Sequence, residues 1–151
     1  MSLRLLLISY FKGDDMKKII QASLVTASLT LFAIPAMAEV VAIVSAKSAA
    51  SAMSADEVAQ FFLGKSAKLT PVDQPESSAI RSEFYKKVAD KEPSQVKSIW
   101  SKLVFTGKGT LPKEYGSSAD VKKAVAADAN LIGYIEKSAV DSSVKVVVSL
   151  P

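Results

Sequence analysis

The chain of 151 residues contains no cysteine and no histidine. These absences exclude disulfides, Cys/His zinc sites, and nucleophilic catalysis of the Ser-His-Asp or Cys-His type. Arginine is also scarce, and the chain contains only Arg4 and Arg81. Carboxylates remain as candidate acids or bases, yet no pair of them lies among apolar residues in a way that would tune its pKa. The composition therefore argues against an enzyme, and we expect no metal ion and no cofactor.

The first 38 residues have the three parts of an export signal. Met16-Lys17-Lys18 is a short basic segment, residues 19–34 are apolar and uncharged, and Ala36-Met37-Ala38 fits the small-x-small cleavage rule. The apolar stretch is short for a membrane span of about 20 residues. The sequence therefore predicts a signal peptide over residues 16–38, cleaved after Ala38, and a periplasmic protein that starts at Glu39.

Residues 1–15 precede this signal and end in Asp14-Asp15, where a signal favours bases. We interpret them as an over-extended start. The alternative is a long leader whose basic segment begins at Met1 and includes Arg4 and Lys12. Both interpretations keep the prediction of export.

Residues 39–151 are long enough for one domain with a hydrophobic core, but too few for two full lobes of a solute-binding protein. This part carries fifteen Lys and Arg against thirteen Asp and Glu, a surplus of two positive charges. No stripe of Lys and Arg interleaved with aromatic residues stands out, so we expect no nucleic-acid partner.

Strands and helices alternate early in this domain, and two strands close it. We predict strands at 40–44, 69–72, 131–135 and 144–150, and helices at 54–64, 78–89, from 93 to before a loop at 105–116, and 117–127. Such an order is typical of an α/β fold with a mixed sheet flanked by helices on both faces.

Residues 73–81, between the second strand and the second helix, form the best candidate site. Ser77 and Ser78 open the helix and Arg81 lies in its first turns. A helix start favours an oxyanion, because its free N–H groups and dipole attract negative charge and hydroxyls and a guanidinium add hydrogen bonds. The alternatives are ordinary N-capping for the serines, and for Arg81 a solvated position or a pair with Asp73 or Glu76. The stripe of Ile80, Phe84 and Val88 predicts that Arg81 lies away from the buried face, whereas Trp100 is expected in the core.

A family resemblance covers nearly all of residues 39–151. The succession AIVS, SADEVAQFFLGK, PVDQPESSAIRSEF, SIWSKLVFTGKG and LIGYI resembles short, single-lobe relatives of the periplasmic phosphate-binding protein of bacterial phosphate ABC transporters. The resemblance implies one lobe of a type II periplasmic-binding-protein fold. It also implies a ligand, phosphate or a related oxyanion, bound at Ser77, Ser78, Ala79 and Arg81, and an ABC permease as membrane partner.

The chain departs from the family pattern inside this loop. Gln74 stands where the family has an arginine, Ala79 replaces a glycine and Ile80 replaces a threonine. Losing one charged donor and one hydroxyl removes about 2 to 4 kcal/mol of gross interaction, which weakens binding by about one to three orders of magnitude. The hydroxyl-rich connection at 45–51, beginning at Ser45, is expected to contribute further, since ligands bind beyond the carboxyl ends of parallel strands.

Two hypotheses follow. The first is an exported, non-catalytic solute-binding protein for phosphate or a related oxyanion, associated with ABC-type uptake, in which a homodimer or a membrane partner replaces the missing wall of the site. The second is a ligand-free interaction or sensory-accessory module that binds a membrane protein. Residues 106–110, TGKGT, lack the spacing of a Walker motif and are interpreted as a surface loop.

Overall fold

The computed structural model describes residues 38–151; the start segment at 1–15 and, apart from Ala38, the signal peptide lie outside the described residues. The elements are β1 (Val40–Ser45), α2 (Ala55–Phe62), β2 (Thr70–Asp73), α3 (Ala79–Ala89), α4 (Pro93–Phe105), β3 (Lys113–Glu114), α5 (Ser118–Ala127), β4 (Leu131–Glu136), the 3-10 turn η1 (Lys137–Ala139) and β5 (Val144–Leu150). The predicted strands and helices are all present, whereas β3 and η1 are additions.

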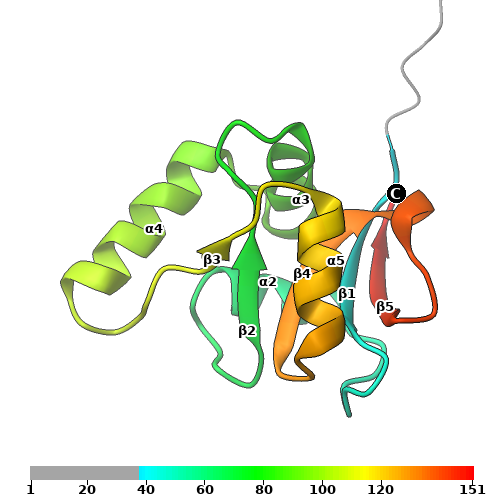
Figure 1. Cartoon of the computed structure of the whole chain (residues 1–151). Helices are drawn as coiled ribbons and strands as arrows, with labels where there is room; N and C mark the ends of the chain where they lie inside the picture. Colours follow the sequence, from blue (N-terminus) through cyan, green and yellow to red (C-terminus); the bar gives the residue numbers. More distant parts are fainter. Residues whose placement is uncertain (1–37) are drawn as a thin grey trace, which may run out of the picture. The chain divides into compact units, whose positions relative to one another are not determined.

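The five strands form one mixed sheet in the order β3-β2-β4-β1-β5 (Figure 1). Strand β2 runs parallel to both β3 and β4. Strand β1 is antiparallel to its neighbours β4 and β5, with a register shift between Ala42 and Ile43 in its pairing with β5. The predicted α/β class with a mixed sheet is confirmed.

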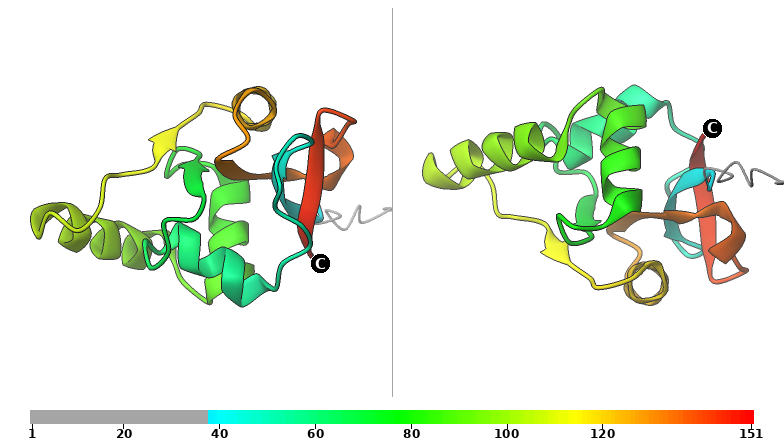
Figure 2. Two further views of the ribbon diagram at one scale, coloured as in Figure 1. Left: turned by 90° about the horizontal axis from the view of Figure 1, so that it is seen from below. Right: turned by 90° about the horizontal axis from the view of Figure 1, so that it is seen from above.

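Helices cover both faces of the sheet (Figures 1 and 2). Successive side chains of a central strand point to opposite faces, so both sets are buried. All six residues of β1 are buried. Val40, Ala42 and Val44 face the core under α2, α3 and α4, while Val41 and Ile43 face the smaller core under α5. A continuous apolar run is therefore explained by burial on two sides.

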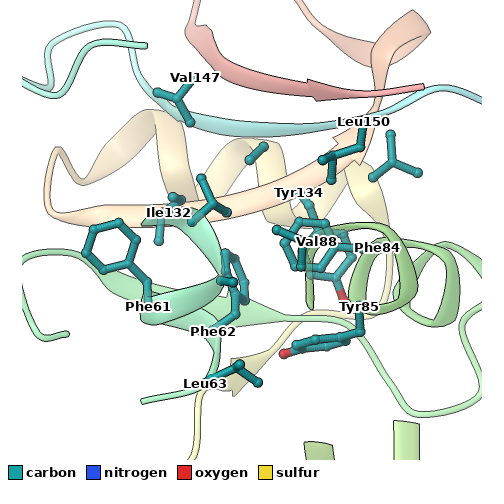
Figure 3. Packing of buried hydrophobic residues seen from close by; sticks show 14 of the residues in the cluster. Phe61, Phe62, Leu63, Phe84, Tyr85, Val88, Ile132, Tyr134, Val147 and Leu150 are labelled. Carbon is teal, nitrogen blue, oxygen red and sulfur yellow. The ribbon is translucent and has the colours of Figure 1, made fainter. Parts of the chain in front are cut away.

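The larger core is built around a group of aromatic rings (Figure 3). Phe84 of α3 stacks on Tyr134 of β4, with 4.1 Å between ring centroids and an interplanar angle of 8°. Phe62 of α2 meets both rings edge to face. These contacts fix α3 against the sheet, and they therefore also fix the loop that precedes α3.

Local signals in the sequence explain the ends of α2. Ser54 and Glu57 form the predicted capping box, each side chain accepting from the other's backbone N–H. Gly64 follows the helix with a φ of 69°, the left-handed conformation that glycine adopts freely. The indole N–H of Trp100 in α4 donates to the carbonyl of Phe62 at 2.9 Å, which joins α4 to the end of α2 and confirms the core position of Trp100.

Candidate functional site

The candidate site lies where β2 ends and α3 begins. Because β2 is parallel to β3 and β4, the carboxyl ends of three strands meet at this edge of the sheet. Residues 74–78 connect β2 to α3 across that edge, which is where open α/β sheets usually bind ligands. The topology thus supports the predicted place of the site.

Asp73, the last residue of β2, is the centre of a buried hydrogen-bond network and is only 3 % exposed. Its Oδ1 accepts from the Tyr134 hydroxyl at 2.5 Å and from the Gln74 backbone N–H at 2.8 Å. Its Oδ2 accepts from the Tyr85 hydroxyl at 2.8 Å and from Nε of Arg81 at 3.2 Å. Four donors occupy the acceptor positions of one carboxylate, which is full satisfaction for a buried charge.

Arg81 is buried, with 6 % of its surface exposed, so the prediction that it lies away from the buried face was wrong. One of the alternatives from the sequence, a pair with Asp73, is what the structure shows. Burial lowers the pKa of Arg81, but the Asp73 carboxylate, with smaller contributions from Tyr85 and Tyr134, raises it, and the pKa stands above its ordinary value. The apolar periodicity of α3 did not predict the burial of Arg81, because that burial depends on a charge partner, Asp73, at the end of β2.

The pair leaves part of the guanidinium free. Nη1 of Arg81 is buried and has no hydrogen-bond partner among the described residues. The guanidinium carbon lies 5.1 Å from the ring centroid of Tyr85, so that the cation also contacts an aromatic face. A buried donor without a partner is costly, and an acceptor arriving from outside would satisfy it.

The side chain of Gln74 makes three hydrogen bonds that hold the loop between β2 and α3 in place. Its side-chain nitrogen donates to Ser118 Oγ and to the Tyr134 carbonyl, each at 3.3 Å. Its Oε1 accepts from Ser78 Oγ at 3.2 Å. Ser78 is the N-cap residue of α3 by position, yet its side chain makes no cap hydrogen bond. The first N–H groups of α3, which have no partner within a helix, therefore receive no side-chain cap from Ser78.

A cleft of about 370 Å³ lies beside this network, between α4 and the strand edge. Its lining includes the cations Arg81 and Lys97 and the carboxylates of Asp73, Glu76 and Glu114. Lys97 pairs with Glu76 at 3.1 Å, and both side chains are largely exposed. Three acids against two bases make the cleft mildly acidic, which opposes anion binding except close to Arg81.

The other predicted site residues are placed as follows. Ser77 and Ala79 are exposed at the start of α3, next to Ser78. Ser45 does not join them: β1 runs antiparallel to β4, so its end lies at the opposite edge of the sheet. Ser45 is 1 % exposed, and its hydroxyl donates to the Ala126 carbonyl. The prediction that Ser45 shares the site was wrong, because it assumed that β1 is parallel to its neighbours.

Two tyrosines of the network were not predicted as site residues. Burial, and then the charge of Asp73, raise the pKa of Tyr85 and of Tyr134 well above the usual value, so both hydroxyls remain donors. No local signal in the sequence marks them, because Tyr134 lies 61 positions from Asp73. In the part of the chain that the structure describes, no cluster of three or more acidic side chains could hold a metal ion.

Comparison with known proteins identifies the fold. No family model and no curated protein matches the chain. Among solved structures, a protein from Clostridium perfringens, assigned as a phosphate ABC transporter substrate-binding protein and solved with bound phosphate, matches 73 % of this chain with a TM-score of 0.58 and 20 % identity. An ABC-type phosphate transport receptor from Vibrio cholerae matches the same share with a TM-score of 0.58 and 17 % identity.

The matches cover 44 % and 46 % of those two proteins, so the chain spans less than half of their length. The fold therefore matches part of the fold of phosphate-transport substrate-binding proteins. This confirms the prediction of one lobe of a type II periplasmic-binding-protein fold. No helix among residues 38–151 is long and apolar enough to cross a membrane.

Proposed function

We propose that the protein is an exported, non-catalytic solute-binding protein that takes phosphate or a related oxyanion and serves ABC-type uptake through a permease. The site proposed is the start of α3, formed by Ser77, Ser78, Ala79 and Arg81. The observation that carries the proposal is the buried Nη1 of Arg81, which has no partner among the described residues and belongs to the first turn of α3. The fold, shared with proteins described as phosphate-transport receptors, supports the ligand class.

The arrangement suits a small oxyanion. The helix dipole and the uncapped N–H groups of α3 attract negative charge, and Nη1 of Arg81 offers a charge-assisted hydrogen bond. The hydroxyl of Ser78 rotates easily, so it can leave Gln74 and donate to a ligand instead.

Binding is expected to be weak for two reasons. The charge of Arg81 is already balanced by Asp73, whose Oδ2 lies 3.2 Å from Nε. The neighbouring cleft adds Glu76 and Glu114, which repel an anion. A millimolar or high micromolar dissociation constant is the expected range, since the gain from one charged and a few neutral hydrogen bonds is small.

The test is a titration of the protein with phosphate, sulfate and chloride, followed by backbone amide NMR shifts. Phosphate should give saturable shifts centred on residues 77–81, and chloride at equal ionic strength should not. Ser78→Ala should weaken the response, whereas the matched control Ser82→Ala, one turn further along α3, should leave it unchanged. Silence at residues 77–81 up to millimolar phosphate and sulfate would overturn the proposal.

Arg81 is tested by Arg81→Lys, which keeps a cation beside Asp73 but removes the planar fork of donors. Binding should be lost while far-UV circular dichroism stays native. Retained phosphate shifts in a folded Arg81→Lys protein would show that Nη1 does not hold the ligand.

A further inference from the structure

Two of the exposed large hydrophobic side chains of the described residues lie at the end of α4. Phe105 is 92 % exposed and Val104 is 43 % exposed, whereas Leu111 lines the clefts beside β2 and Val146 lies in β5. Single exposed apolar residues are common on proteins, but a phenylalanine exposed almost completely beside a second apolar side chain is not explained by the fold.

Val104 and Phe105 are the last two residues of α4. Figures 1 and 2 show α4 running away from the sheet, with its C-terminal end farthest from it and residues 106–112 returning from that end. We call Val104 and Phe105 the α4 tip.

No element among residues 38–151 covers Phe105. At 3.6 residues per turn, Phe105 lies about 140° around the helix axis from the buried Trp100. Trp100 and Val96 face the core, so Phe105 points to the opposite side. The exposure of Phe105 therefore follows from its position on the helix.

The segment of sequence that carries the tip contains lysines but no acidic residue. Residues 93–113 contain Lys97, Lys102, Lys108 and Lys113 and no acidic residue. The rest of residues 39–151 carries eleven basic against thirteen acidic side chains, so the positive surplus of the domain is concentrated in this segment. Lys97 is paired with Glu76, but Lys102 and Lys108, which flank Phe105, have no ion pair among the described residues.

We propose that the α4 tip docks on an anionic lipid surface, with Phe105 and Val104 entering the interface and Lys102 and Lys108 contacting acidic headgroups. Apolar and aromatic side chains bordered by lysines match the depth profile of a bilayer interface, where an apolar layer lies beneath negative charge. The absence of acids from residues 93–113 favours lipid over a protein partner of mixed charge. This inference does not depend on anion binding at α3.

A local probe tests insertion directly. In the full chain, Phe105→Trp is mixed with vesicles of phosphatidylglycerol and phosphatidylcholine with brominated acyl chains, which quench nearby tryptophans. The matched control is Val146→Trp, at an exposed position on β5; the native Trp100 is a constant background in both. We expect quenching at position 105 and none at position 146. Binding should weaken as salt rises, because the screening length falls from about 10 Å at 0.1 M to about 3 Å at 1 M.

The lysines are tested separately. Lys102→Gln/Lys108→Gln should raise the apparent dissociation constant for anionic vesicles about 25-fold, since each lysine near such a surface contributes roughly a fivefold factor. The control Lys86→Gln/Lys123→Gln makes the same charge change on α3 and α5 and should have little effect. No quenching at position 105, equal binding to phosphatidylcholine alone, or a dimer that Phe105→Asp dissociates would each overturn the proposal.

Discussion

The buried ion pair between Asp73 and Arg81 allows the most specific prediction about stability. Both side chains are nearly inaccessible, at 5 % and 7 % exposure. Asp73→Asn removes the negative charge and leaves the guanidinium buried without a counter-ion. Breaking a buried pair from one side costs about 3 to 5 kcal/mol, because the remaining charge is uncompensated. That is a large part of the stability of a domain of this size, roughly 5 to 15 kcal/mol.

The magnitude also follows from the acceptors lost. An asparagine keeps one oxygen for Tyr134 and the Gln74 N–H, but its amide nitrogen cannot accept from Tyr85 or from Nε of Arg81. The assay is urea unfolding at neutral pH, followed by Trp100 fluorescence and circular dichroism. The control Glu83→Gln breaks the i,i+4 pair with Lys87 on α3, which is more exposed and should cost about 0.5 kcal/mol or less.

A double variant separates pair loss from general damage. Asp73→Asn/Arg81→Met replaces the buried cation by an apolar chain and should recover most of the lost free energy of unfolding. A loss below about 1 kcal/mol for Asp73→Asn, or no recovery in the double variant, would refute the reasoning that an uncompensated charge dominates the cost.

Two further predictions concern the same core. The pKa values of Tyr85 and Tyr134 are raised in the folded protein, so above about pH 10 the unfolded chain loses protons that the folded chain keeps. Stability is therefore complete below pH 10 and should fall above it, by up to about 1.4 kcal/mol per pH unit for each tyrosine; Tyr134→Phe should flatten the fall measured by urea midpoints, and an unchanged slope would contradict this. Gly64 and Gly107 both have φ near +70°, but a Cβ at Gly64 would meet Leu103 Cδ1 at 2.5 Å whereas none of the described atoms lies within 4 Å at Gly107. The Leu103 methyl can turn away, but the ring of Trp100 also lies 3.2 Å from the Cβ at Gly64. Gly64→Ala should therefore cost about 1 kcal/mol more than Gly107→Ala in thermal or urea unfolding, and equal costs would show that both side chains of α4 yield freely.

Much of the fold could be predicted from the sequence because its signals are local. The capping box at Ser54 and Glu57, the uninterrupted apolar run of β1 and the periodic apolar residues of α4 each act over a few residues. Strand β3 could not be predicted, because two exposed residues, Lys113 and Glu114, carry no pattern and become a strand only by pairing with β2.

Only part of the candidate site could be predicted from the sequence. Its place at Ser77, Ser78 and Arg81 follows from a loop between a strand and a helix start, which the sequence itself indicates. The direction of β1 decides that Ser45 lies at the other edge of the sheet, and strand direction is a long-range property that no segment encodes alone.

The sequence by itself determined the helices, the four longer strands, the α/β class and the chemistry that is absent. The tertiary structure decided the burial of Arg81, because Asp73, eight positions away, balances its charge and tyrosines from α3 and β4 donate to the same carboxylate. Local patterns report which residues are apolar, whereas burial of a charge depends on which partner the fold brings to it.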